Sequence, residues 1–115
     1  MSQYMLLLYT TEEEEAADRT AEMPMWLELN RSLEESGLLT ATGRLHLSTT
    51  ATTVSAISGE VELTDGPFAI TKEVLVGYYV IEAETLDQAV GVARRIPLIR
   101  YGHVEVRPVM DLRLE

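Results

Sequence analysis

The chain has 115 residues, of which 46% are hydrophobic, and its formal net charge at pH 7 is -10. This length and hydrophobic share predict one domain, residues 1–115, with a core that needs no metal or disulfide for stability. The absence of cysteine excludes thiol redox catalysis, Cys-ligated zinc and a disulfide framework.

Negative charge gathers at the start of the chain, where residues 1–36 hold nine acidic side chains against two arginines. Such a surface repels phosphate backbones, so nucleic acid is not an expected partner. The apolar run near the N-terminus is too short, and too soon followed by acids, for a signal peptide or a membrane span. The composition favours a cytoplasmic protein without a membrane partner.

The first predicted element is a strand. Residues 3–9, QYMLLLY, form an apolar run typical of a central strand covered on at least one face. Residues 12–15, EEEE, follow it. They suit a solvated loop or the first turn of a helix, where carboxylates face the positive end of the helix dipole.

A helix is predicted next, because Trp26, Leu29 and Leu33 recur at intervals of three and four residues. Pro24 fits the first turn of this helix, since its fixed φ suits that position. Gly37 is a suitable left-handed C-cap.

The pattern then changes to a period of two. Leu45 and Leu47 alternate with polar neighbours, and residues 51–58 are rich in β-branched side chains. Ser58 and Gly59 form a candidate tight turn before the next short run. This region is expected to form two or three antiparallel strands.

The last third contains a strand, a helix and a strand. Residues 76–83, VGYYVIEA, form a strong strand signal. Gly77 within this run predicts a β-bulge or a close approach of another backbone. Thr85 and Gln88 fit the capping box that begins a helix. Residues 103–109 alternate as a closing strand.

The element order is β-α-β-β(-β)-β-α-β, which predicts an α+β fold with a ferredoxin-like split β-α-β plan and an inserted hairpin. Two helices can cover only one face of the sheet. The runs at residues 4–9 and 78–81 are apolar, so the other face is expected to meet a second copy in a homodimer.

Residues 64–73, TDGPFAITKE, form a compact polar cassette before the 76–83 strand. Taken alone, Asp65, Gly66 and Pro67 are most often a plain turn. The cassette also carries an aromatic ring, a hydroxyl, a cation and a carboxylate, on Phe68, Thr71, Lys72 and Glu73. A turn does not need these groups, and their variety favours a binding cleft.

The stretch DGPFAITKE resembles the DGPFAETKE signature of the YCII-related family, and GYYVIEA, LDQAVGVARRIP and YGHVEVRPVM resemble the sequence that follows it there. The likeness covers residues 4–110. It implies a ferredoxin-like α+β fold, dimers built as an α+β barrel, and a cleft lined by cassette residues. Members of the family are often encoded beside extracytoplasmic-function sigma factors, and their biochemical role is largely undefined.

The chain departs from the family pattern at two points. Ile70 replaces the first Glu of the signature. Some members of the wider group resemble enzymes because a His on the first helix pairs with an Asp, but the histidines of this chain are His46 and His103. A His-Asp dyad therefore cannot be carried over, and whether the protein is an enzyme stays open.

These residues are compatible with two different functions. The first is a cleft for a small polar metabolite, with Asp65 and Glu73 as acceptors or proton-transfer groups and Lys72 as an anion contact. The candidate catalytic residues are Asp65 and His46, and the candidate ligand-binding residues are Arg44, Gly66, Pro67, Phe68, Lys72, Glu73 and Tyr79. The second is a non-catalytic accessory module that binds a protein such as a sigma factor. No cofactor is expected, and no H-x-H, H-x-x-x-H or D-x-D spacing indicates a metal.

Overall fold

The structure is a computed structural model that describes residues 2–68 and 71–111. The strands are β1 (Ser2–Thr11), β2 (Leu39–Arg44), β3 (Thr52–Ser55), β4 (Glu62–Asp65), β5 (Glu73–Ala83) and β6 (His103–Pro108). The α-helices are α1 (Glu12–Ala16), α2 (Met23–Glu35) and α3 (Leu86–Ala93), and the short 3-10 helices are η1 (Thr20–Glu22), η2 (Ser48–Thr50) and η3 (Pro97–Arg100). No helix within these described ranges is long and apolar enough to cross a membrane.

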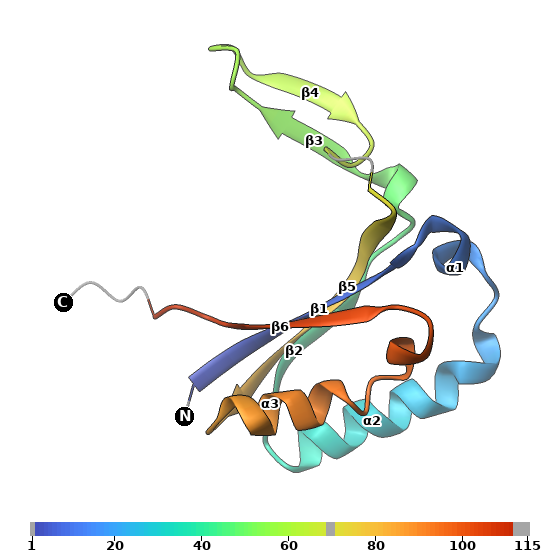
Figure 1. The fold of residues 1–115 in the computed structure, drawn as a ribbon, viewed down its shortest axis with the longest axis vertical. Coiled ribbons are helices and arrows are strands. Elements are labelled where there is room, and N and C mark those ends of the chain that lie inside the picture. The colour runs from blue at the N-terminus through green and yellow to red at the C-terminus, as the bar shows by residue number, and fades with distance from the viewer. Residues whose placement is uncertain (1, 69–70, 112–115) are drawn as a thin grey trace.

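The main sheet has four antiparallel strands in the order β2-β5-β1-β6 (Figure 1). This order confirms the α+β class and is consistent with the ferredoxin-like plan. Strands β3 and β4 pair only with each other, as a hairpin inserted between β2 and β5, and this hairpin stands away from the main sheet in Figure 1.

The core lies between the helices and one face of the sheet. Leu6 and Leu8 alternate along β1 with residues that point the other way, and both are buried. They pack in one cluster with Leu29 and Leu33 of α2, which confirms the predicted helical stripe. Helix α3 adds three small or β-branched side chains to the same cluster, namely Ala89, Val92 and Ala93.

The opposite face of the sheet, called the open face below, carries apolar side chains that no described helix covers. Residues directly opposite each other in an antiparallel pair point to the same side. Met5 faces Val80, Leu7 faces Tyr78, and Tyr9 lies beside them. All five side chains are half-buried, so the open face has a broad apolar centre.

The predicted bulge and close approach at Gly77 are both confirmed. The pairing of β1 with β5 shifts register between Leu8 and Tyr9, beside Gly77. A Cβ atom on Gly77 would lie 3.0 Å from the carbonyl oxygen of Gly43 on β2. Only glycine lets β2 and β5 approach this closely without a shift of the backbone.

The helix ends also agree with their sequence signals. Pro24 lies in the first turn of α2. The side chain of Thr85 accepts a hydrogen bond from the backbone N–H of Gln88 at 3.1 Å, as the capping box predicts. The side chain of Gln88 in return accepts from the N–H of Glu84, one residue earlier than in the standard box.

Candidate functional site

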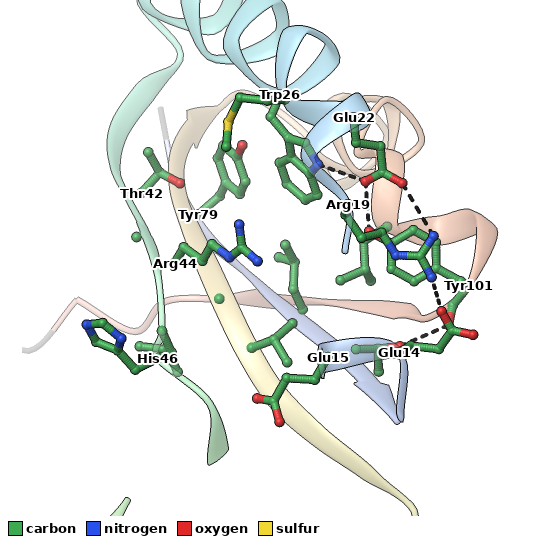
Figure 2. Close-up of a pocket in the computed structure, with 18 of the residues that line it drawn as sticks. Glu14, Glu15, Arg19, Glu22, Trp26, Thr42, Arg44, His46, Tyr79 and Tyr101 are labelled. Carbon is green, nitrogen blue, oxygen red and sulfur yellow. Dashed lines mark hydrogen bonds and ion pairs between the residues drawn. The ribbon is translucent and has the colours of Figure 1, made fainter. Parts of the chain in front are cut away.

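A cavity of about 600 Å³, called the helix-side cavity below, lies between α2 and β2 over the central strands (Figure 2). Its floor consists of Leu8, Thr10, Val76, Gly77 and Tyr79. The α2 wall consists of Met23, Trp26, Leu27 and Asn30, and residues 42–47 form the β2 wall. Its polar end consists of Glu14, Glu15, Arg19, Glu22 and Tyr101. The cavity therefore has an apolar floor with polar groups concentrated at one end.

The carboxylate of Glu22 is the centre of that polar end. Its Oε1 accepts hydrogen bonds from the indole Nε1 of Trp26 at 3.0 Å and from the hydroxyl of Tyr101 at 2.8 Å. Its Oε2 lies 3.3 Å from a guanidinium nitrogen of Arg100. Only 11% of the Glu22 side chain is exposed, and these donors replace the water contacts that burial removes.

Arg19 supports the same network from the other side. Its guanidinium pairs with Glu14 and lies 3.5 Å from the centre of the Tyr101 ring, a cation–π contact. Its Nε is buried and has no acceptor among the described residues. Burial and the nearby negative Glu22 raise the pKa of Tyr101 to about 12, so this hydroxyl stays protonated and acts as a donor at neutral pH.

Arg44 enters the cavity from β2. It lies opposite Gly77 in the sheet, and Figure 2 shows its side chain pointing into the cavity. The absence of a side chain at Gly77 leaves space for it. Within residues 2–68 and 71–111, no carboxylate forms an ion pair with Arg44. The guanidinium donors of Arg44 are therefore available to a ligand.

Tyr79 occupies the floor on the helix side of β5. Its hydroxyl donates a hydrogen bond to the side-chain oxygen of Asn30 on α2. Burial raises the pKa of Tyr79, and a hydrogen bond with Thr42 opposes that rise. The hydroxyl of Tyr79 thus links α2 to β2 across the cavity floor.

The candidate site residues predicted from the sequence do not lie together in the structure. Arg44 and Tyr79 both line the helix-side cavity. His46 lies at its rim, but in Figure 2 the imidazole points away from Arg44 and Tyr79. Asp65 is exposed at the end of β4, and Lys72 is exposed beyond the hairpin. Neither Asp65 nor Lys72 lines this cavity, so the structure does not bring them together with Arg44.

Part of the cassette lines a second cavity of about 650 Å³ at the base of the β3–β4 hairpin, called the hairpin cavity below. Pro67, Phe68 and Glu73 line it together with His46. Gly66 lines neither cavity, but its φ of 92° is the left-handed geometry that the turn prediction required. The signature position Ile70 lies outside the described residues.

Glu73 has a partner that the sequence did not indicate. Its Oε1 lies 2.8 Å from Nδ1 of His103, which begins β6 on the far side of β1. The His103 side chain is largely exposed, so this pair lies at the surface of the sheet and apart from the helix-side cavity.

The polar end of the cavity was missed by sequence reasoning. Residues 12–15 were interpreted as solvated, and Trp26 as part of an apolar stripe. The signal that was present is local: Glu22 precedes the single Trp of the chain by four residues, so both lie on one helical face. Tyr101 could not be added to this pair, because it is 79 residues away in the chain.

The site gives no indication of a metal centre. Across the part of the chain that the structure describes, no group of three His, Asp or Glu side chains could hold a metal ion. The helix-side cavity offers hydrogen-bond donors, the carboxylates of its polar end, the guanidinium of Arg44 and apolar walls.

Two comparisons identify the family. The YCII-related domain matches residues 2–113, nearly the whole chain. An uncharacterized protein of Rhizobium meliloti (strain 1021) is 40% identical over 83 residues, which cover 70% of this chain and 67% of that protein. The branch with the DGPF signature stays a prediction. At the level of the family the inferred resemblance is confirmed, and the chain belongs to the YCII-related family.

Proposed function

We propose that the protein binds a small metabolite that carries an anionic group, such as a carboxylate or a phosphate, in the helix-side cavity. The observation that carries this proposal is the guanidinium of Arg44, which points into the cavity without an ion pair among the described residues. Arginine binds carboxylates and phosphates through paired donors, which makes it suited to anchor such a ligand.

The carboxylates of the cavity support an anionic ligand rather than a cationic one. Glu14 pairs with Arg19, and Glu22 is held by Trp26, Tyr101 and Arg100. Glu15 accepts hydrogen bonds from the backbone N–H and the hydroxyl of Ser48, both at 2.9 Å. Protein donors therefore already engage all three carboxylates. A cationic ligand would have to displace these partners, whereas an anion can bind Arg44 without breaking an existing pair.

Size and shape support a ligand with an apolar body. The cavity volume of about 600 Å³ lies within the roughly 300–1,000 Å³ that is typical of small-molecule sites. Leu8 and Val76 of the floor and Trp26 of the wall offer apolar surface next to Arg44. An aromatic or branched aliphatic acid would place its body on these side chains and its charged group at Arg44.

Binding, rather than catalysis, is the function proposed for this cavity. Tyr101 is protonated at neutral pH and Arg44 is a cation, so neither group can accept a proton there. The carboxylates of Glu14, Glu15 and Glu22 are already bound to protein donors. Acid/base chemistry by Asp65 or His46, the catalytic candidates from the sequence, would have to take place elsewhere, because Asp65 does not line this cavity and the ring of His46 points away from its interior.

We also propose that the protein is a homodimer in which the open faces of two sheets pack together, as in a dimeric α+β barrel. The support is the apolar centre formed by Met5, Leu7, Tyr9, Tyr78 and Val80. Polar residues surround it, with Gln3 and Glu82 at one end and Arg107 at an edge. An apolar centre with a polar rim is typical of protein interfaces. A chain that sediments as a monomer at micromolar concentration would favour a different protein partner for this face.

A thermal-shift screen tests the ligand proposal. The library should pair each anionic compound with its neutral amide or alcohol. At one hundred times its dissociation constant, a ligand stabilises the folded state by about 2.7 kcal/mol. We expect anionic members alone to raise the melting temperature, and we expect Arg44→Gln to abolish the shift. The matched control is Arg94→Gln, which removes the same charge from the exposed end of α3. Equal shifts with neutral partners would contradict the role of Arg44.

A further inference from the structure

The β3–β4 hairpin has one apolar face and one polar face. Val54 lies directly opposite Leu63, so both side chains point to the same side of the hairpin. Val61 precedes Leu63 by two residues, so its side chain points to that side as well. Their exposed fractions are 63%, 71% and 73%. The opposed pair Thr52 and Asp65 lies on the same side, at the base of the hairpin. The other face carries four polar side chains, which are Thr53, Ser55, Glu62 and Thr64. This alternation is typical of a ribbon whose apolar face is covered by protein.

Nothing within the described chain covers that apolar face. Figure 1 shows the hairpin projecting away from the sheet and the helices. An isolated two-stranded hairpin is at best marginally stable in water and gains stability when it packs against other structure. The base of the hairpin is nevertheless well ordered by hydrogen bonds, since Gly66 donates to the carbonyl of Ala51 at 2.6 Å and accepts from Thr53 at 2.7 Å.

The total surface of the chain is larger than that of a compact monomer. The chain exposes 8264 Å², whereas a compact protein of this mass exposes about 6,300 Å². Its radius of gyration is 16.1 Å, compared with about 13 Å for a compact domain of this length. The excess of about 2,000 Å² is greater than the roughly 800 Å² that each partner contributes to a standard interface.

Apolar side chains at the base of the hairpin lie next to the open face. The hairpin cavity lies where they join, because Ala51 and Phe68 from the hairpin base line it together with Tyr9 and Leu75 from the open face. The Phe68 ring is 87% exposed. A partner that covers the open face would therefore also contact the base of the hairpin.

A second copy of this chain fits that surface best. Each copy offers both a projecting hairpin and an apolar face, and a two-fold axis pairs these two features reciprocally. The charges on the hairpin argue against nucleic acid and anionic membranes, since residues 51–66 contain Glu60, Glu62 and Asp65 and no cation. An acidic ribbon is repelled by nucleic acid and by anionic membranes.

We propose that the β3–β4 hairpin is a dimerisation arm, which packs its Val54–Leu63 face on a second copy of the chain and closes the hairpin cavity between the two copies. This inference rests on the proposed dimer and adds to it. The arm explains why the DGPF cassette lies apart from the helix-side cavity: Phe68 at the base of the arm belongs to the interface between the copies.

Thiol protection tests the arm, because the chain has no cysteine of its own. Leu63→Cys places a single thiol on the apolar face, and Thr64→Cys places a matched thiol on the polar face. Sedimentation first measures the monomer–dimer equilibrium of each variant. We expect the alkylation rate of Leu63→Cys to fall with the fraction of free monomer, by mass action, while that of Thr64→Cys stays constant.

Three other results would contradict the proposal, and each would contradict a different part of it. Rapid alkylation of Leu63→Cys in a sample that sediments as a dimer would show that the dimer forms without the arm. Protection in a sample that sediments as a monomer would show that the arm folds onto its own chain. A chain that is monomeric at every concentration, with both thiols reactive, would contradict the dimer and the arm together.

A second pair of variants checks the energetic contribution of the arm. Val54→Thr combined with Leu63→Thr keeps β-forming side chains but removes apolar surface from the interface. We expect the dissociation constant of the dimer to rise about tenfold or more. The control is Thr53→Ser combined with Thr64→Ser, on the polar face, and it should leave the constant unchanged. Equal dissociation constants for the two double variants would contradict the arm.

Discussion

The hydroxyl of Tyr101 donates a 2.8 Å hydrogen bond to the carboxylate of Glu22, which joins the start of α2 to the segment before β6 across 79 residues of sequence. The same oxygen accepts the indole N–H of Trp26. This shared acceptor fixes the polar end of the helix-side cavity, because it connects α2, which forms one wall, to the segment before the edge strand β6.

Removing that hydroxyl should weaken the fold without disrupting it. Tyr101→Phe leaves Glu22 with one donor fewer in a largely buried position, and a hydrogen bond to a charged group contributes about 1.5–3 kcal/mol. We expect the free energy of unfolding in urea to fall within that range. The matched control is Tyr4→Phe, since Tyr4 packs against the core and its hydroxyl is not part of the Glu22 network. Equal losses in the two variants would contradict the role of the Glu22 bond.

Stability should also decline at alkaline pH because of Tyr101. Its pKa is raised from 10.0 to about 12, so between these values the folded chain retains a proton that the unfolded chain has lost. The free energy of unfolding must then fall as the pH rises through this window, and the contribution is complete below pH 10. Urea unfolding at a series of pH values measures this slope. Tyr101→Phe should show a shallower decline, and an unchanged slope would contradict the assignment.

Two Gly→Ala changes should have opposite effects on stability. A Cβ atom on Gly102 would lie 2.3 Å from the carbonyl oxygen of Tyr9, a contact that forces the backbone to move. We expect Gly102→Ala to destabilise the fold by about 1–3 kcal/mol or more. Gly91 lies within α3 with nothing within 4 Å of the added atom. Gly91→Ala should stabilise by about 0.5–1 kcal/mol, because alanine favours the helix. Thermal unfolding of both variants checks the contrast.

The elements with strong local patterns were predictable from the sequence. The apolar run at the start, the stripe through Leu29 and Leu33, and the capping residue Thr85 each depend on neighbours within a few positions. Gly77 was also correctly marked, since a glycine inside a strand signals a bulge or a close approach. These local signals were sufficient for the α+β class. The alternation of Leu45 and Leu47 was misleading, because β2 ends at Arg44 and these two residues lie outside a strand.

The helix-side cavity was not predictable in the same way. Its polar end depends on the contact of Glu22 with Tyr101, and the anion contact proposed for it depends on Arg44 lying opposite Gly77 on the neighbouring strand. Such pairings are set by the packing of distant segments and leave no periodic pattern. The position of Asp65 was missed for a related reason: the turn was predicted, but the direction in which the hairpin leaves the sheet depends on tertiary structure.

The central claim, that Arg44 anchors an anionic ligand beside Trp26, is tested most directly by the fluorescence of Trp26, the only Trp in the chain. An anionic compound selected by thermal shift is titrated into the natural protein, Arg44→Gln and Arg94→Gln. We expect a saturable change in the natural protein and in Arg94→Gln with equal dissociation constants. In Arg44→Gln the constant should rise about tenfold to a hundredfold, as for loss of a charged hydrogen bond. Binding by Arg44→Gln with the natural affinity would contradict the claim.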